Sequence, residues 1–116
     1  MRAVLVLYKD EEAGILTQMD DGSFTYQYHA EWVADPTRPS ISLTLPKREE
    51  LYLSPYLFAF FYNMLPEGSN KRIVCQHHKI DLDDYFSLLM ITAQYDTIGA
   101  VRIEKVDHIS TPKNNL

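Results

Sequence analysis

The chain has 116 residues, a length that fits a single domain with its own core. Its formal net charge of -5 argues against a surface devoted to nucleic acid, because proteins that bind phosphate backbones usually carry a basic excess. Cys75 is the single cysteine, so no internal disulfide can form, which suits a reducing cytoplasm. No stretch approaches the roughly 20 apolar residues of a membrane helix, and the first residues do not read as a signal peptide. We therefore expect a cytoplasmic protein.

The first half of the sequence predicts β structure. The expected strands are 3–8, 14–19, 23–28 and 41–46, each an apolar or alternating run. Asp21-Gly22 is a strong turn signal between the second and third of them. Between the third and fourth, Pro36 and Pro39 predict an irregular segment, with one helical turn over 30–34.

The second half predicts three helices and a closing strand. Ser54 is the expected N-cap of a helix that runs to Leu65, where Pro66 ends it. Gly68 permits a bend, and Ser69 is the expected cap of the next helix. The second and third helices cover 69–78 and 81–95, the latter capped by Asp81, and the strand covers 100–106.

The order of elements is ββββ-ααα-β, which indicates the α+β class. We expect an antiparallel sheet of about five strands with three helices packed on one side. Residues 1–106 would form the single domain, and 107–116 would be a flexible C-terminal tail.

Catalytic and cofactor motifs are missing from the sequence. Cys75 and His78 lie one helical turn apart and could share an ion, but structural zinc takes four ligands, usually in two pairs. The paired carboxylates lie in turns and helix starts, and we find no nucleophile elbow, Walker loop or dinucleotide fingerprint. We therefore expect no catalytic residue, no metal site and no cofactor.

Two features could instead serve binding. Lys71-Arg72 forms a basic group that is either a solvated helix face or a contact for an acidic partner or nucleic acid in a larger assembly. Trp32 is the only tryptophan and lies in the proline-flanked segment. It is either a core residue or an interface anchor, a role in which tryptophan is enriched.

Several short motifs follow one another in the second half. They are Asn63-Met64-Leu65-Pro66-Glu67, then Lys71-Arg72, then Tyr85-Phe86-Ser87-Leu88-Leu89, and finally Asp96 before Gly99-Ala100-Val101. In this order they resemble the N-terminal subdomain of the HipA-like serine/threonine kinase toxins, and the resemblance covers about residues 3–105. The family usually has Gly-Arg-Asp before its Gly-Ala-Val, where this chain has Ala93-Gln94-Tyr95-Asp96. The role of that Gly-Arg pair is therefore not carried over.

The resemblance implies a binding partner of a kinase. In the fused proteins a kinase body follows this subdomain, and its ATP-binding loop and catalytic residues are not found in this sequence. The chain is thus similar to the free-standing, HipS-like protein of bacterial HipBST-like toxin–antitoxin modules. The expected partner is a HipA-like kinase toxin lacking its N-terminal subdomain, with this chain as antitoxin and kinase inhibitor. Trp32, Tyr95 and Asp96 are the predicted partner-binding residues.

Other functions stay open at this point. The chain could be a structural subunit of a DNA-bound autorepressor complex, in which a helix-turn-helix HipB-like protein reads the DNA. It could also be an accessory subunit that stabilises the kinase without inhibiting it. Neither alternative requires this chain to bind DNA directly or to contact a membrane. An independent small enzyme is the third possibility, and no constellation of nucleophile, base and orienting group favours it.

Overall fold

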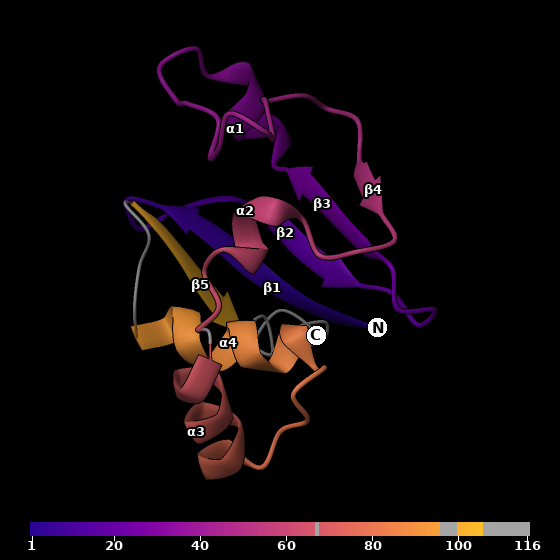
Figure 1. The fold of residues 1–116 in the computed structure, drawn as a ribbon. Helices are drawn as coiled ribbons and strands as arrows, with labels where there is room; N and C mark the ends of the chain where they lie inside the picture. Colours follow the sequence, from indigo (N-terminus) through magenta and orange to yellow (C-terminus); the bar gives the residue numbers. More distant parts are fainter. Residues whose placement is uncertain (67, 96–99, 106–116) are drawn as a thin grey trace, which may run out of the picture.

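The structure is a computed structural model that describes residues 1–66, 68–95 and 100–105, with the backbone alone for 92–95. Its elements are β1 (Arg2–Tyr8), β2 (Glu11–Gln18), β3 (Phe24–Tyr28), α1 (Ala30–Ala34), β4 (Tyr52–Ser54), α2 (Ala59–Tyr62), α3 (Gly68–His78), α4 (Tyr85–Tyr95) and β5 (Val101–Lys105). The strands form one antiparallel sheet in the order β4-β3-β2-β1-β5 (Figure 1). The predicted α+β class and five-stranded sheet are confirmed.

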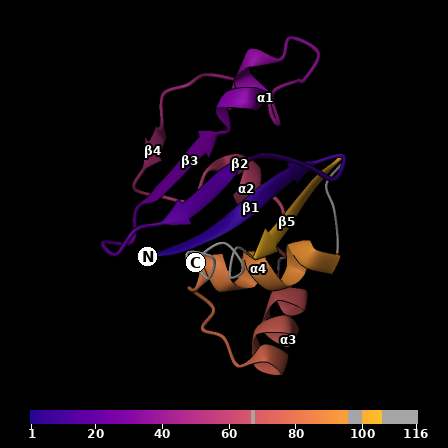
Figure 2. The same ribbon diagram turned by 180° about the vertical axis from the view of Figure 1, so that it is seen from behind.

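The helices are distributed unevenly around the sheet. Figures 1 and 2 show α2 against one face and α4 across the lower end, while α1 lies beyond the opposite end. Helix α3 lies below α4, on the side away from the sheet. The other face of β1, β2 and β3 is not covered by a helix in the described part of the chain (Figure 2).

A tight hairpin joins β1 to β2. Lys9 and Asp10 both have positive φ, 50° and 66°, as the central residues of a type I′ turn require. Asp10 also forms an ion pair with Arg102 of β5, in which Nη2 of the arginine lies 2.9 Å from Oδ1 of the aspartate. The turn is thereby tied to the strand that pairs with the other edge of β1.

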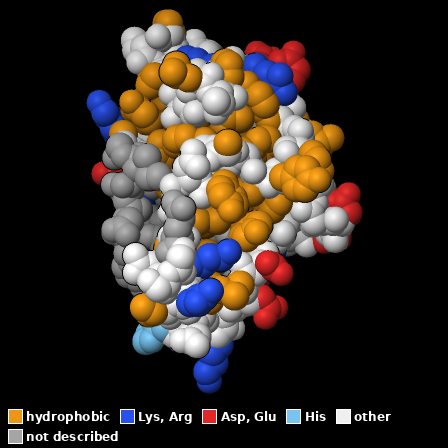
Figure 3. Space-filling model, viewed as in Figure 1, with side chains coloured by type: hydrophobic (Ala, Val, Ile, Leu, Met, Phe, Trp, Pro, Cys, Tyr) orange, Lys and Arg blue, Asp and Glu red, His pale blue; other side chains and the backbone are white. Residues whose placement is uncertain are grey.

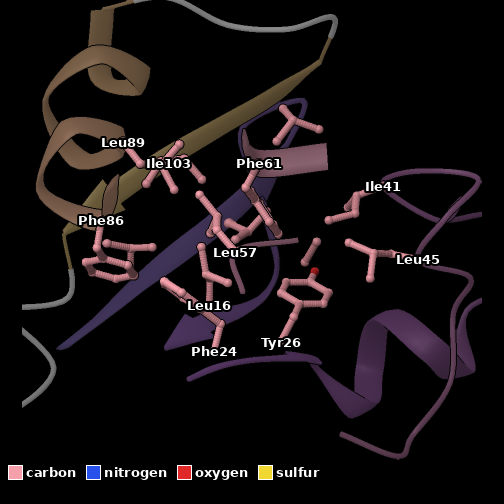
Figure 4. Close-up of a cluster of buried hydrophobic side chains, with 14 of the residues drawn as sticks. Leu16, Phe24, Tyr26, Ile41, Leu45, Leu57, Phe61, Phe86, Leu89 and Ile103 are labelled. Carbon is pink, nitrogen blue, oxygen red and sulfur yellow. The ribbon is translucent and has the colours of Figure 1, made fainter. Parts of the chain in front are cut away.

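The core lies between the sheet and the helices α2 and α4. Its fully buried side chains include Val4, Val6, Leu16, Tyr26, Phe61, Phe86, Leu88, Leu89 and Ile103. Figure 4 shows Phe61 from α2 and Phe86 from α4 reaching toward the sheet. The Phe61 ring is centred 5.8 Å from Tyr26, and the Phe86 ring is 6.4 Å from Phe24. Burial of each such side chain contributes about 1.5–3 kcal/mol, so these two rings hold the short helices to the sheet.

The expected strand over 41–46 is wrong. The segment is a loop with one isolated bridge between Ser42 and Leu45, and Leu43 is 99% exposed. Its apolar residues are anchors: Ile41 and Leu45 are buried, and the Tyr28 hydroxyl accepts from the Ile41 amide and donates to the Leu45 carbonyl. Ile41 and Leu45 are thus the two ends of a short loop, and the Tyr28 side chain holds both ends.

The fourth strand is instead Tyr52–Ser54, which pairs with β3 at the edge of the sheet. Just after it, the helix expected to reach Leu65 is also wrong in extent. Phe58 is extended, with ψ of 140°, so α2 begins only at Ala59. After Tyr62 the turn tightens, because the amides of Met64 and Leu65 bond three residues back.

The last two helices are confirmed in type and differ at their starts. Helix α3 begins at Gly68, whose φ is 59°, so Ser69 is inside the helix and not its cap. Helix α4 begins at Tyr85, and Asp84 caps it in place of Asp81 by accepting from the Ser87 amide at 3.2 Å. Residues 107–116, the expected tail, lie outside the described residues.

Candidate interaction surface

Trp32 is buried inside this chain. It is 3% exposed, and its indole Nε1 donates to the Pro39 carbonyl at 2.8 Å. The Tyr8 ring meets it edge-on, with centroids 5.9 Å apart, and the Arg38 guanidinium lies 4.7 Å from its ring. The core-packing interpretation is therefore confirmed, while contact of Trp32 with a partner stays a prediction.

A network of charges holds the loop around Trp32. Arg38 pairs with Asp35 and Glu11, and Lys47 Nζ donates to the backbone carbonyls of Asp35 and Arg38 at 2.8 and 2.6 Å. Hydrogen bonds from the Thr37 hydroxyl and amide, with the Arg38 contact, lower the pKa of Asp35 to about 2. The loop is thus fixed by its own contacts.

The other two predicted interface residues are Tyr95 and Asp96. Tyr95 is the last residue of α4, and its side chain is not among those described; Asp96 lies outside the described residues. Helix α1, which carries Trp32, lies beyond one end of the sheet, and helix α4 crosses the other end (Figure 1). The structure therefore does not bring Trp32 together with Tyr95.

An apolar hollow lies between the β2–β3 turn, the β4–α2 loop and α4. It has a volume of about 330 Å³ and includes Gly22, Phe24, Pro55, Leu57 and Asp83 in its lining. Tyr56, Tyr62 and Tyr85 also line it. Phe24 and Leu57 are 5% and 8% exposed, whereas Tyr56 is 77% exposed. Buried apolar groups thus sit beside a tyrosine that stands out in solvent.

A second hollow, of about 290 Å³, adjoins the first across the rings of Tyr62 and Tyr85. These rings line both hollows and meet edge-on, with centroids 5.6 Å apart. The second hollow is also lined by Asn63, Leu65, Pro66, Gly68 and Lys71. We call the two hollows together the tyrosine groove.

The tyrosine groove is on the face with α2, α4 and α3. Figure 3 shows apolar side chains gathered over α2 and the adjoining loops, with Lys and Arg side chains below them toward α3. Lys71 Nζ lies 5.1 Å from the centre of the Tyr85 ring, and no ion pair joins it to an acid in the described residues. The groove therefore has an apolar half and a half with an available cation.

Sequence reasoning did not assign the groove residues to a surface. The expected helix from Ser54 to Leu65 includes both Tyr56 and Tyr62. The available signal was the basic group at Lys71-Arg72, just after this helix. Because Phe58 is extended, Tyr56 lies in a loop and its ring is free of the core.

A larger hollow, of about 620 Å³, is lined by residues of β2, β3 and the chain before β4. Its lining mixes polar and apolar residues, with Thr17, Thr25, Gln27, His29 and Glu49 among the polar ones. Its apolar members are Ile15, Ala30, Leu51 and Tyr28, and the one aromatic ring among the described lining residues is buried, since Tyr28 is 3% exposed. Affinity between proteins rests mainly on desolvated anchors, so the smaller tyrosine groove is the better candidate.

The described titratable groups do not gather into a reaction centre. Burial raises the pKa of the Tyr26 phenol, whose hydroxyl has no hydrogen-bond partner among the described residues and lies against Gly14. Cys75 is buried, with its thiol 4.0 Å from the Asp81 carbonyl. Among the described residues, no three His, Cys, Asp or Glu side chains are close enough to hold a metal ion.

No helix in the described ranges has the length and apolar character needed to cross a membrane.

Comparison with known protein families identifies one family. The family described as the HipA N-terminal domain matches residues 4–104. An uncharacterised protein of Haemophilus influenzae is 29% identical over 105 residues, covering 90% of this chain and 93% of that protein. A solved structure, the N-terminal domain of HipA toxin, superposes with a TM-score of 0.67 at 24% identity, covering 92% of this chain and 94% of the other.

Proposed function

The chain belongs to the HipA N-terminal domain family, and on that premise we propose that it is a non-catalytic, HipS-like component of a bacterial toxin–antitoxin module. Its partner is a HipA-like serine/threonine kinase that lacks this subdomain. By binding that kinase in the cytoplasm, the chain neutralises it. The observation that carries the proposal is the family match over residues 4–104.

The surface of the molecule supports a binding role. Interfaces between domains of one chain commonly bury about 600–1,500 Å². A subdomain that works separately from its kinase body must present such a surface to solvent. The tyrosine groove has this character, since Tyr56 is 77% and Tyr62 48% exposed.

Inhibition of this kind needs no chemistry in the inhibitor. A protein that binds an unproductive conformation of the kinase better than the productive one shifts the kinase toward the unproductive one. A shift from mostly active to mostly inactive kinase requires a preference of about 10⁴-fold between the two conformations. The proposal therefore demands a tight, conformation-selective complex.

Co-expression tests the proposal directly. A HipA-like kinase that lacks this subdomain, taken from the same organism, would be produced alone and with the chain, and growth, co-purification and autophosphorylation would be measured. We expect a stable complex, relief of growth arrest and reduced kinase activity. A kinase that neither co-purifies with the chain nor changes in toxicity would refute the proposal.

The same experiment separates the two alternatives. If the chain raises kinase abundance but leaves kinase activity per molecule unchanged, it is an accessory subunit that stabilises the kinase. If it changes neither but is retained on operator DNA together with a helix-turn-helix HipB-like protein, it is a structural subunit of a repressor complex.

A further inference from the structure

We infer that the tyrosine groove is the kinase-binding surface and that it receives a segment of the kinase with an acidic side chain next to a large apolar one. This inference deepens the proposed function and rests on it. The groove crosses the α2–α4 face, where exposed tyrosines, a buried apolar floor and an available cation lie side by side.

The tyrosines supply the anchors. Tyr56 and Tyr62 are the most exposed large side chains of the groove, and neither hydroxyl makes a hydrogen bond within the described residues. Tyrosine is enriched in interface hot spots because its ring buries a large area with few rotatable bonds. The Tyr62 ring is held by its edge-on contact with Tyr85, so it loses little freedom on binding.

The apolar hollow determines one side chain of the occupant. Its lining includes Pro55, Leu57 and Phe24, and the last two are almost completely buried. A carboxylate placed on this floor would lose its hydration and would face the like charge of Asp83, which lines the same hollow. A leucine, methionine or aromatic side chain suits the hollow.

The second hollow determines the neighbouring side chain. Lys71 borders it and lies over the Tyr85 ring, without an ion pair to any acid that the structure describes. The segment 68–79, which includes α3, has the basic residues Lys71, Arg72 and Lys79 and no acidic one, and Glu67 directly precedes it in the sequence. A carboxylate from the partner would neutralise part of this positive charge. The Asn63 side chain is a further polar group that lines the same hollow.

The charge balance favours a protein occupant over nucleic acid. The groove contains Lys71 at one end and Asp83 at the other, so it is mixed in sign. A nucleic-acid-binding surface neutralises several phosphates with several cations, and a carboxylate in the groove would repel the phosphates. A protein segment can match both signs.

Binding of the purified kinase to groove variants tests the inference. We expect Tyr62→Ala and Tyr56→Ser each to raise Kd about tenfold or more, as loss of a hot-spot ring does. Lys71→Glu should raise Kd by a similar factor at low salt and by clearly less at about 0.5 M salt, because screening weakens the charge contact. The tyrosine variants should show no such salt dependence.

Two matched controls isolate the groove. Lys79→Glu makes the same charge change just after α3 but outside the groove, and Leu43→Ala removes an apolar side chain that is 99% exposed in the loop after α1. Both should leave Kd within about twofold of the wild type, as energetically neutral surface positions do. Circular dichroism melting of each variant confirms folding, and Tyr56→Ser is the variant least able to disturb it.

The outcomes distinguish the inference from the function on which it rests. If wild-type chain fails to bind the kinase, both are refuted. If wild-type binds and the groove variants bind equally well, the groove is refuted and the proposed function stands. An equal loss in Lys79→Glu would assign the effect to the general field of α3 and refute the groove. If the chain forms a homodimer in sedimentation and Tyr62→Ala dissociates it, a second copy of the chain occupies the groove. That result would refute the groove as the kinase-binding surface.

Discussion

The sheet and the helical half of this chain differ in how they use their aromatic residues. In the sheet, Tyr26 and Tyr28 are 0% and 3% exposed, and their rings pack edge-on with centroids 4.9 Å apart. In the helical half, Tyr62 and Tyr85 also meet edge-on, at 5.6 Å, but Tyr62 is half exposed. The same side chain and the same contact therefore serve the core in one region and the surface in the other.

The two regions differ in how many of their residues are buried. Both edges of strand β1 pair with neighbouring strands, and its four consecutive residues from Val4 to Leu7 are buried. Helix α3 has 11 residues, and among them only Cys75 is buried. A region with few buried groups contributes little to stability, so its exposed residues can serve binding without loss of the fold.

The sharpest test of this contrast is a pair of neighbours in α2. Phe61 is fully buried between Tyr26, Phe58 and Phe60, so Phe61→Ala should reduce the free energy of unfolding by about 3–5 kcal/mol. Tyr62→Ala should cost less than about 1 kcal/mol, because its ring is half exposed. Urea unfolding measures both, and similar losses at the two positions would break the comparison.

A second test addresses close packing within the sheet. A Cβ on Gly14 would lie 2.5 Å from both the Gln27 carbonyl and the Tyr26 hydroxyl, so Gly14→Ala should cost about 3 kcal/mol. At Gly22 a Cβ would meet nothing within 4 Å, and Gly22→Ala should cost only about 1 kcal/mol for its φ of +90°. Thermal unfolding compares them. Adding Tyr26→Phe to Gly14→Ala should recover part of the loss, and no recovery would assign the clash to the backbone alone.

A third test concerns Trp32, which belongs to the core in the structure and was predicted from sequence as an interface residue. Trp32→Phe removes the hydrogen bond to the Pro39 carbonyl and some buried area, so it should cost about 1–2 kcal/mol in urea unfolding. An unchanged unfolding energy would contradict the core role. Unchanged affinity of the folded variant for the kinase would remove Trp32 from the interface.

The smallest expected effect is at the junction between the two regions. Arg2 of β1 donates to Asp84 at 2.8 Å and to Ser87 at 2.7 Å, at the start of α4. Burial acts to raise the pKa of Asp84, but the hydrogen bonds from Arg2 and Ser87 outweigh it and hold the pKa below its usual value. The unfolded chain therefore binds a proton more readily, and the stability that this pair contributes above pH 4 or so is lost as pH falls further.

The Asp84→Asn variant should lack this contribution to the pH dependence of stability. Asparagine retains the cap of α4 while losing the charge, so the cost near pH 7 should be about 1 kcal/mol or less for a partly exposed pair. The stability of the variant should fall less steeply than that of the wild type as the solution is acidified. Asp83→Asn is the neighbouring control, and an equal flattening there would contradict the assignment to Asp84.

Sequence patterns predicted the parts of the fold in which local periodicity and burial coincide. The strands β1 and β3 alternate or run apolar as expected, because neighbouring strands fix which face each residue occupies. The segment 41–46 alternates equally well and is a loop, because Tyr28 binds both of its ends. No local pattern encodes a contact made by a side chain more than ten residues away.

The candidate surface was less predictable than the fold for a related reason. A helical stripe can be read from spacing, but the extended backbone at Phe58 depends on packing against Tyr52 and Phe61. That change moves Tyr56 from a helix into a loop and opens the groove. The basic group at Lys71 was visible in the sequence, whereas its position over the Tyr85 ring arises only when α3 and α4 meet.

The place of β1 in the sheet has a consequence for the order of synthesis. β1 pairs with β2 almost at once, but its other edge waits for β5, nearly a hundred residues later. While the nascent chain leaves the ribosome, the unpaired backbone along Val4–Tyr8 is an open strand edge, a template for aggregation. A ribosome that stalls before residue 101 would hold the chain in this state, so translation speed across α3 and α4 determines how long the first strand remains exposed.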